Sequence, residues 1–315
     1  MHSPLTRRHL LKVAGATTAG AVVTHEQLAA QSSPADEHPF GYCLNTSTIQ
    51  GQKVPLIEQV RIAASAGYNG IEIWLRDLDK YLAEGGNLPD LKKRLEDLNL
   101  SVESAIGFAT WIVDDANQRQ AGLEQARRDM AKLRQIGGKR IAAPPAGATK
   151  QTDLDLLKAA ARYHALLEVG RQEGVVPQVE LWGFSQSLHR LGELLYVAAE
   201  SGAEDACLLP DVYHLYKGGS SFAGLHLISG KKIHVFHVND YPATPSRETI
   251  TDAHRVYPGD GVAPLTDIFK GLWETGFRGT LSLELFNRDY WKQDPLSVAR
   301  TGLAKMKQSV RRAFS

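Results

Sequence analysis

Residues 233–240 read Ile-His-Val-Phe-His-Val-Asn-Asp, and this stretch decides the fold. Its first six residues are mostly β-branched or aromatic, as in a buried strand, and its end is polar. Seven further short runs of the same kind occur along the chain. The eight predicted strands span residues 42–49, 70–75, 102–107, 140–143, 176–181, 206–210, 233–238 and 280–285.

Helical patterns alternate strictly with these strands. The predicted helices span residues 55–66, 91–98, 123–136, 154–173, 188–200, 222–228, 265–274 and 295–312. Alternation of this kind predicts a parallel sheet with helices outside it, and eight units predict a closed TIM (β/α)8 barrel as a single domain. No GxGxxG or phosphate-binding loop pattern follows the first strand, which disfavours a nucleotide-binding fold.

The composition is that of an ordinary globular enzyme. Of the 315 residues, 43% are hydrophobic and 23% are charged. A net charge of +1 gives no reason to expect a surface built for nucleic acid. The two cysteines, Cys43 and Cys207, belong to predicted strands that are not neighbours in a barrel. We therefore interpret them as buried thiols.

The first thirty residues differ from the rest of the chain. Residues 6–12, Thr-Arg-Arg-His-Leu-Leu-Lys, precede a weakly apolar run, and residues 28–30 offer small side chains for cleavage. This pattern resembles a twin-arginine export signal. We predict a signal at 1–30, a linker at 31–39 and the barrel at 40–315. The protein would use the twin-arginine translocation machinery and be periplasmic or otherwise exported. An uncleaved basic helix is the alternative.

Removal of this signal would take away three basic residues and one acidic residue, which changes the net charge from +1 to −1. The weakly apolar run is shorter than the roughly 20 residues that span a bilayer. The mature protein predicted in this way is a near-neutral exported barrel.

Four potential metal ligands end four consecutive predicted strands. Glu180 ends the fifth strand, and Asp211 follows the sixth. His237 and Glu284 end the seventh and the eighth. Barrel active sites lie at the carboxyl ends of the strands, so these side chains are expected to converge. Three buried carboxylates would repel one another unless a cation neutralised them. Oxygen-rich ligands suit Mn²⁺ best, with Mg²⁺, Co²⁺ and Zn²⁺ as alternatives.

An ordered set of motifs surrounds these four residues. The motifs are Glu180, Asp211-Val-Tyr-His214, His237-Val-Asn-Asp240, Pro258-Gly259-Asp260-Gly261, Glu284 and the earlier phrase Gly67-Tyr68-Asn69-Gly70-Ile71-Glu72. The set resembles the xylose isomerase-like TIM-barrel superfamily. Within it, the chain is similar to the sugar epimerases and isomerases typified by tagatose and psicose epimerases, and also to inosose dehydratase and hydroxypyruvate isomerase.

The resemblance implies a metal-dependent isomerase or epimerase for a sugar or keto-sugar. It implies that Glu180, Asp211, His237 and Glu284 hold one divalent metal ion. Glu180 and Glu284 would also be the catalytic acid and base on opposite sides of the substrate, with an enediolate between the two proton transfers. His214 would hydrogen-bond a substrate oxygen. The resemblance further implies a homodimer or a tetramer.

Three further residues are substrate-binding candidates. Trp182 lies on the same strand face as Glu180, so it either forms a wall of the sugar pocket or packs in the core. Glu72 either contacts substrate or is a solvated acid at a strand end. The family places an arginine soon after the seventh-strand histidine. Here both Arg247 and Arg255 are candidates, and we include Arg255 in the predicted site.

Three rival functions remain open beside the isomerase or epimerase. A metal-dependent lyase or dehydratase would remove the same proton from a keto-sugar or 3-keto-glycoside and then expel a β-substituent. A phosphodiesterase similar to endonuclease IV would need more histidine and acidic ligands and a basic groove. A barrel that only binds sugar is disfavoured because all four ligands are present. The expected partner is a small-molecule carbohydrate and not nucleic acid.

Overall fold

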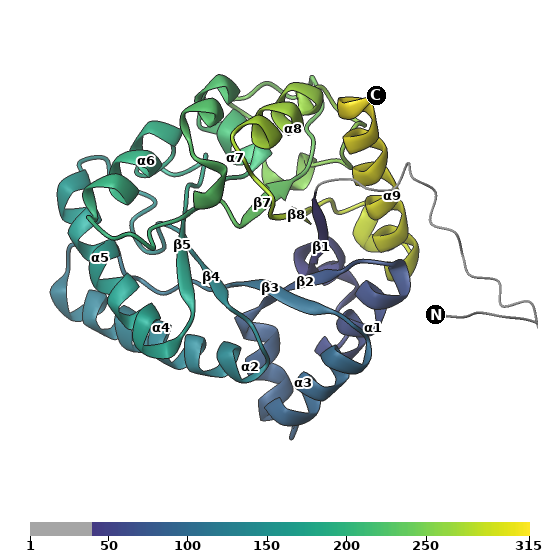
Figure 1. Ribbon diagram of the computed structural model, residues 1–315, viewed down its shortest axis with the longest axis horizontal. Coiled ribbons are helices and arrows are strands. Elements are labelled where there is room, and N and C mark those ends of the chain that lie inside the picture. The colour runs from purple at the N-terminus through teal and green to yellow at the C-terminus, as the bar shows by residue number, and fades with distance from the viewer. Residues whose placement is uncertain (1–39) are drawn as a thin grey trace, which may run out of the picture. The chain divides into compact units, whose positions relative to one another are not determined.

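A computed structural model describes residues 40–315, which form a single TIM barrel with strands at the centre and helices around them (Figure 1). The predicted signal at 1–30 and the predicted linker at 31–39 lie outside the described residues. Within the described part, no helix is both long and apolar enough to cross a membrane.

Eight parallel strands form the barrel wall in the described part of the chain. They are β1 (Gly41–Asn45), β2 (Gly70–Trp74), β3 (Ser101–Ile106), β4 (Arg140–Ala143), β5 (Val176–Glu180), β6 (Leu208–Leu209), β7 (Val235–Val238) and β8 (Thr280–Leu283). Hydrogen-bonded pairing runs β3-β2-β1-β8-β7 and, separately, β4-β5-β6. Parallel bridges from Leu208 to Ile233 and from Asp211 to His237 join β6 to β7, and β3 packs beside β4. The predicted barrel is confirmed.

Helices cover the outside of the barrel. The α-helices within residues 40–315 are α1 (Leu56–Ala66), α2 (Leu75–Ala83), α3 (Leu88–Asp97), α4 (Ala116–Gln135), α5 (Leu156–Glu173), α6 (Leu191–Glu200), α7 (Val212–Lys217), α8 (Leu265–Glu274) and α9 (Pro295–Phe314). Short 3-10 helices are η2 (Thr46–Gln52), η3 (Phe222–Leu227), η4 (Gly230–Lys232), η5 (Asp252–His254) and η6 (Tyr290–Lys292). The predicted pattern contained neither α2 nor α7.

Local capping explains where the element boundaries differ from the prediction. The first strand ends at Asn45 and not at residue 49, because the Asn45 side chain accepts a hydrogen bond from Ser47 N and starts η2. Helix α4 begins seven residues before its predicted start, because Asp115 caps it by accepting from Gln118 N. Polar caps of this kind satisfy backbone N–H groups that the first turn leaves free.

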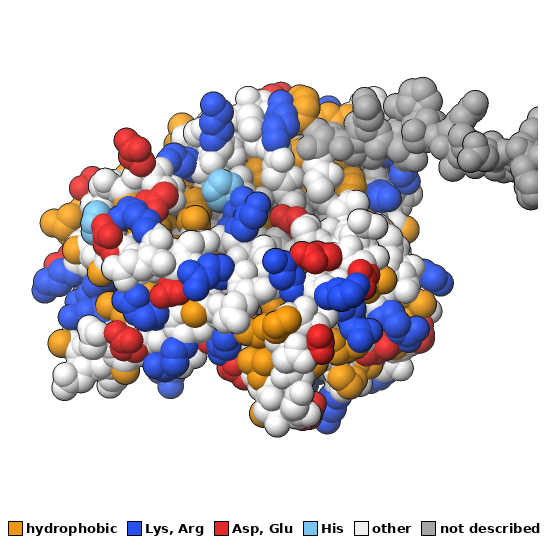
Figure 2. All heavy atoms as spheres, turned by 60° about the horizontal axis from the view of Figure 1, so that its bottom comes forward, with side chains coloured by type: hydrophobic (Ala, Val, Ile, Leu, Met, Phe, Trp, Pro, Cys, Tyr) orange, Lys and Arg blue, Asp and Glu red, His pale blue; other side chains and the backbone are white. Residues whose placement is uncertain are grey.

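The surface shown in Figure 2 carries interspersed acidic and basic side chains. The main apolar core is formed by residues of the strands together with the inward faces of the helices. A smaller apolar cluster includes Trp74, Ile106, Ala142, Leu209 and Val235, at or near strand ends. These two apolar clusters hold the strand ends in place, and the polar site lies at the carboxyl ends of the strands.

Candidate active site

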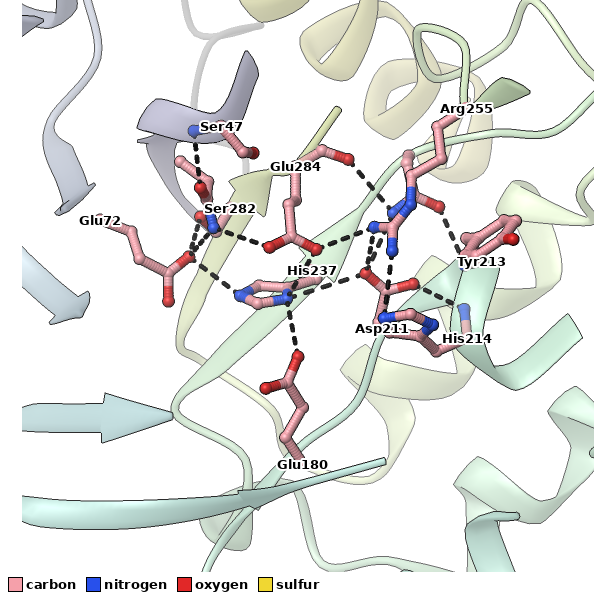
Figure 3. A network of polar contacts seen from close by, with 12 residues as sticks. Ser47, Glu72, Glu180, Asp211, Tyr213, His214, His237, Arg255, Ser282 and Glu284 are labelled. Carbon is pink, nitrogen blue, oxygen red and sulfur yellow. Dashed lines mark hydrogen bonds and ion pairs between the residues drawn. The ribbon is translucent and has the colours of Figure 1, made fainter. Parts of the chain in front are cut away.

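The four predicted metal ligands converge at the carboxyl ends of β5 to β8 (Figure 3). His237 Nδ1 lies 3.4 Å from Glu284 Oε2 and 3.7 Å from Asp211 Oδ2. The same nitrogen lies 3.9 Å from Glu180 Oε1. All four side chains are buried. The four residues predicted from the strand ends therefore lie together in the structure.

Asp211 is held by the start of α7. Its Oδ1 accepts a 2.7 Å hydrogen bond from His214 N, so the Asp-x-x-His spacing is that of a helix cap and the first turn behind it. Asn239 fixes the other oxygen, because its Nδ2 donates to Asp211 Oδ2 at 3.1 Å while its Oδ1 accepts from Tyr213 N. Asp211 Oδ2 consequently faces His237.

Glu72 orients His237 from behind. His237 Nε2 lies 2.9 Å from Glu72 Oε2, which also accepts hydrogen bonds from Ser282 Oγ and Asn45 Nδ2. Burial favours a raised pKa for Glu72, but the charge and hydrogen bonds of His237 and its other partners hold its pKa below the ordinary value. Glu72 has no exposed surface, so the structure places it behind the imidazole and not in the predicted contact with substrate.

The donor atoms of Asp211, His237 and Glu284 fit one divalent cation, and Glu180 lies beside them without belonging to that group of three. His237 Nδ1 is buried and has no hydrogen-bond partner among the described residues. Two atoms that each bind one ion at about 2.1 Å lie at most about 4.2 Å apart. The three separations from Nδ1 to the carboxylates are all shorter than this limit. Asp211, His237 and Glu284 also offer ligand atoms within 4.8 Å of one another.

The two predicted catalytic carboxylates differ in their surroundings. Glu284 Oε1 accepts from Asn45 Nδ2, and its Oε2 accepts from Arg255 Nη1 at 2.8 Å. Burial opposes ionisation of Glu284, but His237 and Arg255 outweigh it and lower the pKa. Glu180 makes an ion pair with His237 and no side-chain hydrogen bond within residues 40–315. Burial raises the pKa of Glu180 well above its ordinary value, and His237 only partly offsets this.

Arg255 is the arginine that enters the site. Its guanidinium is fully buried, and Nη1 donates to Asp211 Oδ2 at 2.9 Å and to Glu284 Oε2 at 2.8 Å. Its Nη2 lies 3.1 Å from His214 Nε2 and donates to Asp252. Arg247, the other candidate, has an exposed side chain that pairs with Glu248. The position of Arg255 agrees with its inclusion in the predicted site.

A long loop after β7 carries Arg255 into place. Backbone hydrogen bonds between Asp240 and Val256 close the base of the loop 241–255. The Asp240 side chain accepts from the backbone N–H groups of Gly259, Gly261 and Ala263. A side chain at Gly261 would begin 2.2 Å from Tyr241 O, so this turn requires glycine.

The loop also docks on α7. The rings of Tyr241 and Tyr216 stack at 3.8 Å, and Tyr213 Oη donates to Ile250 O. Ile250 is fully buried in this contact region. Because α7 also carries His214, the loop and the helix together fix the distance between His214 and Arg255.

A pocket of about 170 Å³ opens above these residues. Its polar lining is Glu180, His214, Asp252, Arg255 and Glu284, and its apolar lining is Trp74, Ile106, Phe108, Trp182, Phe184 and Phe286. Trp182 thus lies in the wall of the pocket, one of its two expected positions. A larger depression of about 520 Å³ lies beside His234 and Arg140. We place the site in the smaller pocket because the converging carboxylates are there.

Sequence reasoning missed three residues that position the site. Asn45 donates to both Glu72 and Glu284, and Asn239 fixes Asp211. Asp252 is paired with Arg255 and lines the pocket. Asn45 ends β1, so the strand-end argument finds it once the strand is ended correctly.

Comparison with known proteins agrees with this geometry. The sequence profile of the xylose isomerase-like TIM barrel family matches residues 60–309. Inosose isomerase of Bacillus velezensis is 26% identical over 254 residues, which cover 79% of this chain and 90% of that protein. The 3-dehydro-D-guloside 4-epimerase of Escherichia coli K12 is 24% identical over 79% of this chain and 93% of its own length.

Two further similarities bear on the reaction and on the fold. A 3-dehydroshikimate dehydratase of Pseudomonas aeruginosa is 26% identical over 80% of this chain, which spans only 39% of that protein. The crystal structure of the IOLI protein with a bound zinc atom superposes with a TM-score of 0.81 and 22% identity. That superposition covers 88% of this chain and 100% of the other. The similar proteins thus include an isomerase, an epimerase and a dehydratase.

Proposed function

The chain belongs to the xylose isomerase-like TIM barrel family, and we propose that it is a divalent-metal-dependent isomerase or epimerase of a sugar or keto-sugar. The observation that carries the proposal is His237 Nδ1, which has no hydrogen-bond partner within residues 40–315 and lies within 3.9 Å of three carboxylates. The isomerase and the epimerase that match most of the chain support the reaction class.

The proposed proton transfers use Glu180 and Glu284. Figure 3 shows their carboxylates on opposite sides of the His237 imidazole. A carboxyl group with a raised pKa, such as Glu180, can take up a proton near neutral pH and return it. Glu284, which Asn45 and Arg255 hold in place, would be the partner on the other side.

Glu180, Asp211, His237 and Glu284 would hold the ion. When bound, it would stabilise the negative charge that develops on the carbonyl oxygen as the neighbouring proton leaves. We propose Mn²⁺ because three of the four ligands are carboxylates. Zn²⁺ is the alternative supported by the zinc-containing structure of similar fold.

His214 would bind a substrate oxygen, and Arg255 would hold His214 and the carboxylates in place. Burial and the charge of Arg255 lower the pKa of His214 to about 4, so its imidazole is neutral at pH 7. A neutral imidazole can donate or accept a hydrogen bond to a hydroxyl group without changing the charge of the site. Arg255 lies next to it, and its five N–H groups are all used on Asp211, Asp252, Glu284 and His214, so it would orient the imidazole.

The lining of the pocket favours an uncharged carbohydrate. Among the described residues that line it, Arg255 is the sole cation, and it already pairs with Asp211, Asp252 and Glu284. No second cationic side chain therefore lines the pocket among the described residues to bind a phosphate group. The proposed substrate is an unphosphorylated sugar or keto-sugar.

A lyase or dehydratase is the second candidate, and the similarity to 3-dehydroshikimate dehydratase favours it. Both reactions begin with removal of the proton next to the carbonyl group. NMR of products formed in deuterated water from a panel of keto-sugars and 3-keto-glycosides tests both. Deuterium on that carbon with an intact skeleton indicates an isomerase or epimerase, and an unsaturated product indicates a lyase. Absence of both exchange and turnover across the panel would contradict the proposal.

We further propose that the protein acts after export by the twin-arginine route. The support is the Arg7-Arg8 pair and the weakly apolar run that follows it. These residues lie outside the described part of the chain. A homodimer or tetramer stays a prediction from the family resemblance.

A further inference from the structure

Five aromatic side chains line the pocket. We call Trp74, Phe108, Trp182, Phe184 and Phe286 the aromatic collar. The ring centroids of Phe286 and Trp74 lie 6.1 Å apart, and those of Trp74 and Phe108 lie 5.3 Å apart. Phe108 lies 5.9 Å from Trp182, which stacks on Phe184 at 5.3 Å.

Two polar residues complete the circle. Phe184 lies 5.9 Å from the His214 ring, and the Arg255 guanidinium lies 5.1 Å from the centre of the Phe286 ring. His214 and Arg255 are themselves 3.1 Å apart. The aromatic collar, His214 and Arg255 therefore form a continuous ring of side-chain contacts around the pocket.

The collar has a buried part and an exposed part. Trp74 is only 7% exposed and packs against Ile106 in the smaller apolar cluster. By contrast, Phe108 is 45% exposed and Phe184 is 48% exposed, with Trp182 between them. Packing does not account for two phenylalanine rings that are almost half in water. Exposed apolar surface next to a pocket is typical of a binding site.

The pocket is small compared with this collar. A volume of about 170 Å³ is below the about 300–1,000 Å³ of pockets that enclose drug-sized ligands. A single ring held against Glu180 and Glu284 would use that volume. The exposed faces of Phe108 and Phe184 would then lie beside whatever is attached to that ring.

We propose that Phe108, Trp182 and Phe184 form an outer subsite for a second, uncharged ring of the substrate. That ring would be joined by a glycosidic bond to the sugar in the pocket, so the substrate is a glycoside and not a free monosaccharide. The inference rests on the proposed function. Aromatic side chains stack on flat apolar faces, which both an aryl group and the C–H face of a sugar provide.

The charged side chains that line the pocket agree with an uncharged second ring. The Arg76 guanidinium lies 3.9 Å from the centre of the Trp74 ring but does not belong to this lining. Asp252 lines the pocket and is partly exposed, so it disfavours an anionic group. Arg255 already forms ion pairs with three carboxylates, so its charge is offset and it would not attract an anionic group on the second ring. The collar lines the same pocket as Glu180 and Glu284. We therefore infer that the outer subsite binds another part of the substrate and not a separate ligand.

The test compares three ligands that share one keto-sugar. These are the methyl and phenyl 3-keto-β-D-glucosides and the 3-keto disaccharide from cellobiose. Their dissociation constants are measured by calorimetry with Mn²⁺ present, on the full chain carrying Glu180→Gln to prevent turnover. The phenyl glycoside or the disaccharide should bind about three- to tenfold more tightly than the methyl glycoside. A preference for one of them identifies the source of the second ring.

Variants of the exposed rings locate the effect. Phe108→Ala and Phe184→Ala should each bring the ratio of the methyl glycoside's dissociation constant to that of the preferred ligand closer to one. Phe184→Leu keeps much of the side-chain volume but loses the flat ring, so it should also lower this ratio. Leu227→Ala is the matched control, since Leu227 is 82% exposed on η3 and does not line the pocket. Equal binding of all three ligands, or no binding of any, overturns the subsite.

Failure of the proposed function would look different. Turnover of keto-sugars by the wild-type protein is measured separately. Turnover without a ring-dependent preference overturns the subsite and leaves the proposed function intact. A ring-dependent preference without turnover overturns the proposed function and leaves the subsite intact.

Discussion

His237 and Glu72 are joined by a 2.9 Å contact between Nε2 and Oε2, and neither side chain has any surface exposed to water. This contact leaves Nδ1 as the nitrogen that faces the carboxylates. A carboxylate behind a ligating histidine fixes the orientation of the ring and makes it a better donor.

The Glu72→Gln variant should bind the metal more weakly, because it removes the negative charge behind His237. We expect a loss of about 10- to 100-fold in metal affinity with the fold retained. Titration of the apoprotein with Mn²⁺ or Zn²⁺ measures it. Glu168→Gln, on the exposed surface of α5, is the control. Unchanged affinity in Glu72→Gln would show that this contact has only a packing role.

The protein should hold about one divalent ion per chain, and His237→Ala or Asp211→Ala should lose it. Because a ligand that binds only the folded state stabilises it, free metal at 100 times its Kd should add about 2.7 kcal/mol to the free energy of unfolding. Elemental analysis and thermal unfolding with and without a chelator measure these effects. No metal and an unchanged melting temperature would refute the ligand set.

Glu180→Gln and Glu284→Gln should each lose most turnover, because an amide cannot take up a proton at neutral pH. The expected decrease in kcat is about 10²- to 10⁴-fold. Loss of catalysis in Glu180→Gln should occur with most of the metal retained, whereas Glu284→Gln should also disturb Asn45 and Arg255. Near-full activity in both variants would remove these residues from the mechanism.

Acid should destabilise the fold partly through His234. Burial, with Arg140 and Lys232 nearby, lowers the pKa of His234 to about 4. Below about pH 6.5 the unfolded chain binds a proton at this histidine and the folded chain does not. The stability present above pH 6.5 is therefore lost as the pH falls toward 4.

The His234→Gln variant should show a smaller loss of unfolding free energy between pH 7 and pH 4.5. Urea unfolding of the chelated protein at several pH values measures it. His226→Gln, at an exposed position, should behave as the wild type does. Identical pH profiles for all three proteins would argue against a lowered pKa of His234.

Replacing Arg7 and Arg8 by lysine should keep the protein in the cytoplasm. The twin-arginine pathway reads the arginine pair itself, so conservation of charge should not suffice. Fractionation of cells that express the wild type and the double variant measures the location. Equal amounts outside the cytoplasm would refute the predicted route.

The strands could be predicted from the sequence because each is a short apolar run between longer helical patterns. The same reasoning missed α7, which is only six residues long. Its start depends on the Asp211 side chain as a cap, a role that the metal-ligand interpretation did not consider.

The ligand set could also be predicted, since strand ends in a barrel converge whatever the details of the loops. The side of the site on which a residue lies could not be predicted from the sequence. Glu72 ends up behind His237, and this depends on contacts with Asn45 and Ser282 from two other strands. Phe108 and Phe184 gave no sequence pattern, because a single aromatic residue in a loop has the same appearance whether it packs or binds.

The hydrogen-bonded base between Asp240 and Val256 has an evolutionary consequence. The two ends of this loop are hydrogen-bonded to each other, so its interior can change in length without moving β7 or α8. We call such a loop an exchangeable cassette. Arg255 sits at the last position inside that cassette, next to its hydrogen-bonded base. Insertions between residues 242 and 249 would leave the contacts of Tyr241 and Ile250 with α7 in place. They could therefore reshape the rim of the pocket while the arginine keeps its place over the carboxylates, so that selectivity and catalysis can diverge independently.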